Sequence, residues 1–279
     1  MRKSIQLSHK YIFSHQMIKK KIDLTVIIPA YKQSKTIIND VKNIKRQLDS
    51  IRYTYEIIIV FDGKIDNSYL KIKQLKLSSI TCIEYGENQG KFYAIRLGMR
   101  YAKGYYVMFL DAGMEIDPSG ISMLLQHMEW YQADIIVGSK RHPASLVEYT
   151  LSRKILSFGY YWIVRLLFSI SVTDTQAGLK LFRLPVLETI LPLLVENKFA
   201  GDLEMLVVAQ QKGFTRIFDS PIKLSYKWSK ITSAASLHSI INILIDTVAI
   251  FYRANILHYY DKPKKIATIE TPVKIYRTN

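Results

Sequence analysis

The chain has 279 residues, 49% of them hydrophobic, which is enough for a substantial core and excludes bulk disorder. Lysine and arginine exceed aspartate and glutamate by 39 − 23 = 16, so the surface should attract phosphates or an anionic membrane, although charge alone selects neither. Cys82 is the only cysteine, which excludes an intrachain disulfide.

The chain opens with a basic segment, residues 1–22, that has no acidic residue. Its sequence, MRKSIQLSHKYIFSHQMIKKKI, lacks the continuous apolar core of a signal peptide, so we expect no secretion signal there. The strand and helix patterns begin after it, and we expect one domain over residues 23–230.

Five short runs rich in isoleucine and valine predict strands, because they lack the polar alternation of half-exposed strands. They cover residues 24–30, 56–62, 80–85, 105–111 and 133–139. Helix-length segments separate them at residues 34–50, 66–76, 90–103 and 118–131. This alternation predicts an α/β domain with a mainly parallel sheet.

The ends of the first two runs carry residues suited to a nucleoside. Pro29, Ala30 and Tyr31 predict a stiff turn with an aromatic face on which a base could stack. Asp62 follows the second run and could accept from a nucleobase imide or a ribose hydroxyl. Ligands of parallel sheets bind beyond the carboxyl ends of strands, so these residues are candidates for a nucleotide site.

Two further signals fall on the same edge. The segment NQGK opens a helix and places Lys91 with free backbone donors where a phosphate is favoured. The fourth run ends in Asp111. A strand-end aspartate alone is more often a cap or turn former, but four signals on one edge predict a binding site.

The order of motifs VIIPAY, IIIVFDG, NQGK, FLDA, ADIIVGSK, DTQAGLKLF and DLEMLVVAQQKGF resembles the family 2 glycosyltransferases of GT-A fold. The resemblance is closest to the branch of dolichyl- and polyprenyl-phosphate hexosyl synthases, and it covers residues 24–230. It implies a Rossmann-like, mostly parallel sheet flanked by helices, with membrane-facing amphipathic helices toward the C-terminus.

The resemblance assigns a donor site. Pro29, Ala30, Tyr31 and Asp62 would hold the base and ribose, and Lys91 would lie near the phosphates of the nucleotide sugar.

The metal motif departs from the family pattern. Asp111 would be the first aspartate of the Asp-any-Asp motif, with catalytic, nucleotide-binding and metal-binding roles, but Gly113 stands at the second. Glu115, two residues on, would replace it, so that Asp111 and Glu115 bind Mg²⁺ or Mn²⁺. Asp117 competes for this role, although its place before Pro118 favours a helix cap.

The resemblance also assigns an acceptor site in the second half. Lys140, Arg141, Arg153 and Gln176 would bind the phosphate of a lipid carrier, although surface lysines and arginines are more often only solvated. Asp202 would be a catalytic or substrate-orienting carboxylate. The competing interpretation of Asp202 is a helix cap at the start of FAGDLEML.

Two apolar segments, residues 155–172 and 240–252, contain charged or polar residues and are shorter than the roughly 20 uninterrupted apolar residues of a transmembrane span. We expect them to lie on a membrane, with ordinary buried helices as the alternative. The expected organisation is completed by an amphipathic membrane-associating region at residues 231–260 and a basic tail at residues 261–279.

The resulting hypothesis is an inverting glycosyltransferase at the cytoplasmic face of a membrane, peripherally attached. It would move a hexose from a nucleotide-diphosphate sugar to polyprenyl or dolichyl phosphate, with a UDP-sugar preferred and GDP-mannose as the other donor. A glycan or glycolipid acceptor, or an inactive nucleotide-sugar-binding homologue, are the alternatives. Nucleic acid is not an expected partner, because no recognition-helix, zinc-finger or RNP-like pattern occurs.

Overall fold

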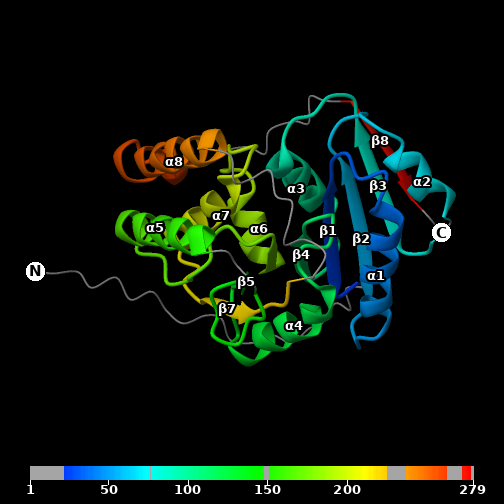
Figure 1. Cartoon of the computed structure of the whole chain (residues 1–279), viewed down its shortest axis with the longest axis horizontal. Coiled ribbons are helices and arrows are strands. Elements are labelled where there is room, and N and C mark those ends of the chain that lie inside the picture. Colours follow the sequence, from blue (N-terminus) through cyan, green and yellow to red (C-terminus); the bar gives the residue numbers. More distant parts are fainter. Residues whose placement is uncertain (1–21, 76, 148–150, 225–236, 263–271, 278–279) are drawn as a thin grey trace, which may run out of the picture.

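The computed structural model describes residues 22–75, 77–147, 151–224, 237–262 and 272–277, with the backbone only at residues 151–154 and 237–239. These residues form an eight-stranded mixed sheet in the order β7-β5-β6-β4-β1-β2-β3-β8. Helices cover both faces (Figure 1).

The strands are β1 (Leu24–Ala30), β2 (Tyr55–Phe61), β3 (Ile80–Tyr85), β4 (Tyr106–Leu110), β5 (Ile135–Ser139), β6 (Leu179–Arg183), β7 (Ile217–Pro221) and β8 (Val273–Arg277). The helices are α1 (Ile37–Asp49), α2 (Ser68–Gln74), α3 (Lys91–Arg100), α4 (Ile121–Trp130), α5 (Leu151–Phe168), α6 (Leu184–Ile190), α7 (Gly201–Gln211) and α8 (Leu237–Phe251). Shorter helical turns are η1 (Pro118–Gly120), the π-helical η4 (Tyr252–Ile256) and η5 (Tyr259–Asp261).

All five predicted strands are confirmed as β1 to β5, and the four predicted helices as α1 to α4. The strands could be predicted because helices cover both faces of the sheet. Helices α1, α2 and α4 pack on one face, and α3, α6 and α7 pack on the other. Every residue of β1 is therefore buried. The parallel pairs β1·β2, β1·β4, β2·β3 and β5·β7 confirm the mainly parallel arrangement.

Strand β6 was not predicted, and it determines the layout of the site. It lies between β4 and β5 and is antiparallel to both, with Leu110 opposite Leu179. The antiparallel direction brings the segment DTQAGLK to the carboxyl end of β4, where the amide of Asp111 donates to the carbonyl of Gly178 at 3.0 Å. The inserted strand therefore carries the second half of the chain back to the edge that holds Asp111.

The C-terminal part is more closely joined to the domain than the sequence suggested. Residues Val273–Arg277, expected in a basic tail, form β8 and pair antiparallel with β3, covering what would otherwise be a sheet edge. Ile250, Ala254 and Tyr260, expected in a separate amphipathic region, are buried in the same core as α3 and α7. The boundaries at residues 230 and 260 are therefore not boundaries of the core. The segment 1–22 lies outside the described residues except for Ile22.

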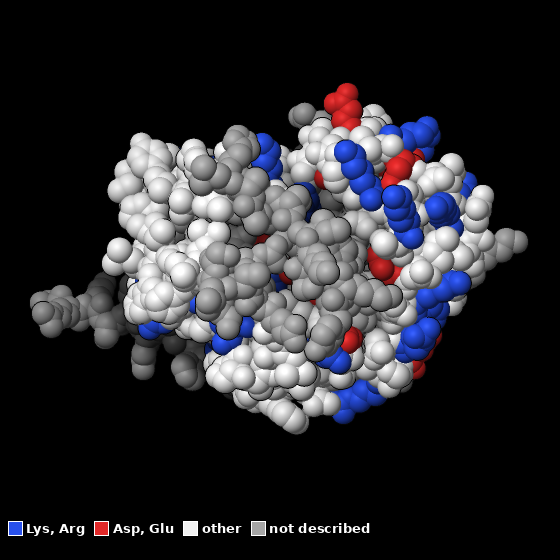
Figure 2. All heavy atoms as spheres, viewed as in Figure 1, with Lys and Arg blue, Asp and Glu red and all other residues white. Residues whose placement is uncertain are grey.

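Helices α5 and α8 lie together at the end of the molecule opposite α1 and α2 (Figure 1). The hydroxyls of Tyr160 and Thr247 are 3.0 Å apart, and the rings of Phe168 and Phe251 pack edge to face. The two helices and η4 expose a set of large apolar side chains: Ile155, Leu156, Phe158, Trp162, Ile163, Leu166, Ile241, Ile245, Val248, Tyr252 and Ile256. On the face drawn in Figure 2 this end is nearly free of charge, whereas lysines and arginines gather on the side of α1 and α2. Among the helices that the structure describes, none has both the length and the hydropathy needed to cross a bilayer.

Helix α3 comes close to the sheet because Gly98 has no side chain. A Cβ there would lie 2.6 Å from Ile27 Cγ2 and 3.2 Å from Val60 Cγ2. We expect Gly98→Ala to lower the free energy of unfolding by about 1–3 kcal/mol, because overpacking outweighs the better helix propensity of alanine. The matched control is Gly159→Ala in α5, where a Cβ meets no atom within 4 Å, and which should stabilise by about 0.5–1 kcal/mol. Chemical denaturation measures both, and equal stabilisation would show that α3 is not tightly packed.

Candidate active site

Four side chains of alternating charge form a chain at the carboxyl edge of the sheet. Lys91, the first residue of α3, places its Nζ 2.8 Å from Asp111 Oδ2 and 3.5 Å from Asp202 Oδ2. Asp202, on the first turn of α7, accepts a hydrogen bond from Lys180 on β6 through Oδ1. Lys180 Nζ also donates to the carbonyl of Ala177 at 2.8 Å. The chain thus joins β4, α3, α7 and β6 at one point.

One end of this chain is buried and the other is open. The side chains of Lys180 and Asp202 are 0% and 2% exposed, whereas those of Lys91 and Asp111 are 19% and 32% exposed. Burial lowers the pKa of Lys180, and Asp202 opposes that shift. Burial also acts to lower the pKa of Lys91, but Asp111 and Asp202 raise it above its ordinary value. Among the described residues, the charged chain is open to solvent at Lys91 and Asp111 and closed at Lys180 and Asp202.

The carboxylate of Asp111 lies tightly against the polypeptide backbone at Gly178, which leads into β6. A Cβ on Gly178 would lie 2.1 Å from Asp111 Oδ2, so only glycine fits at this position of DTQAGLK. Burial raises the pKa of Asp111, Lys91 lowers it, and the nearby charges of Asp202 and Glu115 raise it further. Three carboxylates therefore lie near this point, with Lys91 paired to Asp111 and Asp202, and Lys140 paired to Glu115.

The residues fit a divalent cation. Asp111 Oδ1 is buried and, within the described residues, accepts no hydrogen bond, which leaves one hard oxygen unsatisfied. Glu115 lies close enough to act on Asp111 electrostatically, and its Oε1 is 3.3 Å from Lys140 Nζ. Among the described residues no group of three or more His, Cys, Asp or Glu side chains is arranged to hold a metal. A cation bound by Asp111 and Glu115 would take further ligands from diphosphate and water, as Mg²⁺ commonly does.

The structure explains why glycine occupies position 113. Gly113 has φ +93°, a left-handed conformation that favours glycine, and its amide donates to Asp40 Oδ2 of α1 at 3.2 Å. Asp117 accepts from the amide of Ser119 at 2.9 Å, which confirms that it caps η1.

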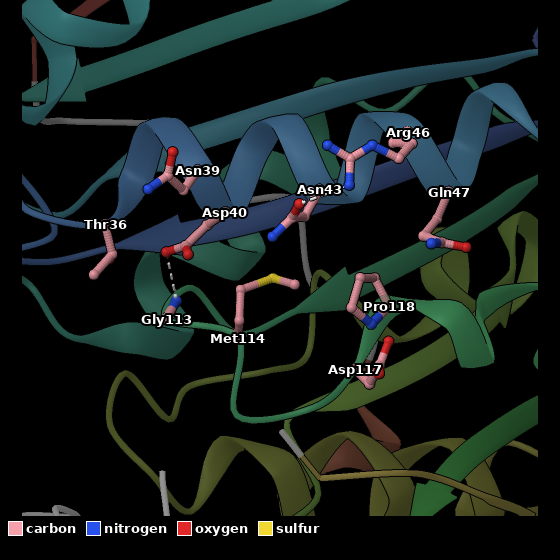
Figure 3. A pocket seen from close by; sticks show the side chains of 10 residues that line it. All are labelled: Thr36, Asn39, Asp40, Asn43, Arg46, Gln47, Gly113, Met114, Asp117 and Pro118. Atoms are coloured by element: carbon pink, nitrogen blue, oxygen red, sulfur yellow. Dashed lines mark hydrogen bonds between the residues drawn. The ribbon is translucent and has the colours of Figure 1, made fainter. Parts of the chain in front are cut away.

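A surface hollow of about 330 Å³ lies between α1 and the loop at residues 113–118 (Figure 3). It is lined by Thr36, Asn39, Asp40, Asn43, Arg46, Gln47, Gly113, Met114, Asp117 and Pro118. None of the four charged-chain residues lines it, so the hollow is separate from the candidate active site.

The donor candidates after β1 differ from the expected turn. Pro29 and Ala30 are buried residues of the strand itself, and the chain leaves the sheet only at Tyr31. Tyr31 is exposed, and the ammonium of Lys32 lies 5.1 Å from the centre of its ring. Of the three residues, Tyr31 alone presents a side chain on which a base could stack.

Asp62 is buried, and its carboxylate is engaged inside the protein. It accepts from Tyr85 Oη at 2.8 Å, Asn88 Nδ2 at 2.8 Å and the amide of Gln89 at 2.7 Å. The contact of Asp62 with a nucleotide remains a prediction. The observed bonds show that this carboxylate fixes the NQGK loop ahead of α3.

The expectation of free backbone donors at the start of α3 is wrong. The amides of Phe92 and Tyr93 donate to the carbonyl of Asn197 at 2.9 and 3.3 Å, and the amide of Gly90 donates to Asp62. The carbonyl of Asn197 satisfies the amides of Phe92 and Tyr93, and the carboxylate of Asp62 satisfies that of Gly90, in place of a ligand. The ammonium of Lys91 is therefore the phosphate-binding candidate that remains at this helix start.

The structure brings three of the four acceptor candidates to α5. The guanidinium of Arg141 donates to Ser157 Oγ at 2.7 Å, and Gln176 Nε2 donates to Tyr160 Oη at 3.1 Å. Lys140 links the same loop to Glu115. Arg153 is in the first turn of α5, but its side chain lies outside the described residues.

The family model of glycosyl transferase family 2 matches residues 25–191, more than half of the chain. The chain belongs to this family. It is a glycosyltransferase, and the charged chain lies at the strand edge where ligands of α/β sheets bind.

Similar proteins include dolichyl-phosphate beta-glucosyltransferases. One from Trichomonas vaginalis is 26% identical over 88% of this chain and 78% of its own length, and one from Saccharomyces cerevisiae is 27% identical over 88% of this chain and 79% of its own length. The GT-A fold is matched by glucosyl-3-phosphoglycerate synthase from Mycobacterium tuberculosis, solved with Mn²⁺, uridine diphosphate and phosphoglyceric acid. That structure has a TM-score of 0.62 at 12% identity and covers 92% of this chain and 88% of its own. At this identity the likeness shows the fold alone.

Sequence reasoning missed Lys180, the buried partner of Asp202. A signal was present, because a lysine inside the apolar run GLKLF requires a buried counter-charge if the run is a central strand. The roles of Asn197 and Tyr160 had no local signal, because their partners are distant in sequence.

The buried pair can be tested by removing its cation. Lys180→Met should lower the free energy of unfolding by about 3–5 kcal/mol, because it leaves the carboxylate of Asp202 buried without its main partner. Adding Asp202→Asn should restore part of this loss. Lys45→Met is the control: Lys45 and Asp49 form a pair at 2.8 Å with an exposed carboxylate, worth at most about 1 kcal/mol. Urea denaturation compares the three, and equal losses from Lys180→Met and Lys45→Met would contradict a buried ionised pair.

Proposed function

We propose that the enzyme transfers glucose from a nucleotide-diphosphate sugar, with UDP-glucose the preferred donor, to a polyprenyl or dolichyl phosphate. The observation that carries this proposal is the charged chain Asp111–Lys91–Asp202–Lys180. Glu115, which acts electrostatically on Asp111, pairs with Lys140, and the neighbouring Arg141 bonds to Ser157 of the apolar helix α5. The names of the similar proteins support glucose and dolichyl phosphate. The uridine diphosphate bound by the M. tuberculosis fold neighbour is compatible with the donor.

In this reaction an oxygen of the acceptor phosphate attacks the anomeric carbon, and the bond from that carbon to the diphosphate oxygen breaks with inversion. The electron pair leaves with the nucleoside diphosphate. A lipid phosphate is already anionic near neutral pH, so little proton abstraction is needed. Asp202, fixed by Lys180 and facing Lys91, therefore orients reacting groups rather than deprotonating the nucleophile.

Negative charge develops on the leaving diphosphate, and Lys91 is placed to stabilise it. A cation held by Asp111 and Glu115 would act as a Lewis acid that neutralises the same charge. Lys140 and Arg141 would hold the acceptor phosphate, with Gln176 beside them.

We further propose that the apolar surfaces of α5 and α8 rest on a membrane. Trp162, Leu166, Ile245 and Val248 expose large apolar surfaces on these helices. Each such side chain fully removed from water contributes roughly 1.5–3 kcal/mol, and each lysine or arginine near an anionic leaflet about 1 kcal/mol. A lipid carrier would then present its phosphate to the enzyme from the surface on which the enzyme sits.

The direct test is incubation of the purified protein with polyprenyl phosphate and a panel of labelled UDP- and GDP-sugars. Transfer of label from UDP-glucose into a solvent-extractable lipid phosphate is the expected result. Transfer only from GDP-mannose would correct the donor. Transfer to a glycan or glycolipid, with none to lipid phosphate, would overturn the acceptor.

The metal site predicts a graded loss of activity. Glu115→Gln should reduce transfer at limiting Mg²⁺ or Mn²⁺ by about 10²-fold, because an amide of the same size replaces a charged ligand. Asp111→Asn should be at least as damaging, since Asp111 also pairs with Lys91. Asp117→Asn is the control, because Asp117 caps η1 and is not assigned to the metal. Full activity of Glu115→Gln across a metal titration would exclude Glu115 as a ligand.

The acceptor site predicts a change in one Michaelis constant. Lys140→Ala combined with Arg153→Ala should raise KM for lipid phosphate by about ten-fold or more while KM for the nucleotide sugar stays within about two-fold. The control double variant is Lys42→Ala with Lys73→Ala, which removes two exposed cations from α1 and α2. Equal effects on both substrates would place Lys140 and Arg153 in a different pocket.

A further inference from the structure

A buried tyrosine ties the C-terminal segment to α7. Tyr260, in η5, is fully buried, and its hydroxyl donates to Glu204 Oε1 at 2.7 Å. Arg253 of η4 donates through Nε to Tyr260 Oη at 3.2 Å, and its Nη2 pairs with Glu196. The segment after α8 is therefore bonded to α7 and to the loop that precedes it.

Glu204 passes this connection to that loop. It lies two residues after Asp202 on α7 and is 1% exposed. Its carboxylate accepts from the amides of Val195 at 3.1 Å and Glu196 at 2.9 Å. A single carboxylate thus holds Tyr260 on one side and the backbone at residues 195–196 on the other.

The same loop caps the helix that begins with Lys91. The carbonyl of Asn197 accepts from the amides of Phe92 and Tyr93, and Arg96 of α3 donates to Asn197 Oδ1 and to the carbonyl of Leu194. A Cβ on Gly90 would lie 2.4 Å from the carbonyl oxygen of Asn197, so the loop and the helix start are in close contact. The position of Lys91 therefore depends on the loop at residues 194–197.

We infer that Tyr260 and Arg253 are positioning residues of the transfer reaction, acting through Glu204 and the loop at residues 194–197 on Lys91 and Asp202. The inference rests on the proposed function for the reaction whose groups are positioned. The bonds end at two of the four elements that the charged chain joins, the start of α3 and the first turn of α7.

The connection also reaches the apolar end of the molecule. Ile245 and Val248 of α8 and Ile256 of η4 are exposed, whereas Ile250 and Ala254 of the same segment are buried in the core. One continuous segment therefore has an apolar outer face and an inner face that fixes Glu204. If Tyr260 had a purely structural role, and not the positioning role inferred above, its substitution would lower stability without lowering turnover.

The first test compares Tyr260→Phe with Tyr252→Phe, which removes a hydroxyl from an exposed tyrosine of the same segment. Tyr260→Phe should lower kcat about ten-fold, because small displacements of catalytic groups are costly, while both KM values stay within about two-fold. Tyr252→Phe should match the wild type. An unchanged kcat with a lowered Tm would show a structural role only and overturn the inference. A loss carried by KM would place Tyr260 in substrate binding and also overturn it.

The second test uses Arg253, whose guanidinium group donates to both Tyr260 and Glu196. Arg253→Met should lower kcat in the same way as Tyr260→Phe, and Arg253→Lys should recover part of it, because lysine keeps the charge toward Glu196. If Tyr260→Phe does not fold, this pair decides the question. Equal turnover of Arg253→Met and the wild type would overturn the inference.

A readout independent of transfer is amide hydrogen exchange, measured on the full chain. In Tyr260→Phe the amides of Phe92, Tyr93, Val195 and Glu196 should exchange about ten-fold faster. The first two donate to the carbonyl of Asn197 and the last two to the carboxylate of Glu204, which Tyr260 holds in place. Amides of β1 should be unchanged. Absence of lipid-phosphate transfer in the wild type would reject the proposed function, whereas unchanged exchange at Phe92 and Tyr93 would reject this inference.

Discussion

The ion pair between Lys180 and Asp202 is the constraint on which the rest of the site depends. Both side chains are buried, and an unpaired charge at such a depth would be strongly destabilising, so β6 and α7 must lie where the two groups meet. Asp202 then faces Lys91, and Lys91 faces Asp111. Each charge is compensated by the next, from the core to the surface. The two cations and two anions leave this group of four side chains without net charge before substrate binds.

This chain of charges explains features of the sequence that have no local cause. Gly178 is required because the Asp111 carboxylate lies where its Cβ would be. Gly113 interrupts the aspartate motif because its amide is bonded to Asp40 with a left-handed backbone. The left-handed backbone at this attachment to α1 favours glycine over aspartate. In the part of the chain that the structure describes, Asp111 Oδ1 has no hydrogen-bond partner, and Glu115 acts on Asp111 electrostatically.

The sequence predicted the first half of the fold well because each parallel strand there is covered on both faces, which produces runs that can be recognised locally. It did not predict β6, β7 or β8, which pair with strands distant along the chain, β6 and β8 antiparallel and β7 parallel. The position of Asp111 at the end of β4 was predicted for the same reason as the strand itself, whereas its role in a site stays a proposal. Lys180 had a signal in the sequence, a charge inside the apolar run GLKLF, that the prediction did not use. The contacts of Asn197 and Tyr260 arise from tertiary structure and follow from no sequence spacing.

A lipid phosphate joins an anionic head to a long apolar tail, and the arrangement of this enzyme matches that division. Arg141 contacts Ser157 of α5 on one side, and Lys140 contacts Glu115 of the loop at residues 113–118 on the other. The basic loop therefore lies between an exposed apolar surface and the charged chain. An acceptor that lacked the tail would use the cations but not the apolar surface, whereas one that lacked the phosphate would bring no anionic group to the basic loop. Both halves of the surface are used only by an amphipathic anionic acceptor, which is the physical reason to favour lipid phosphate over a soluble glycan.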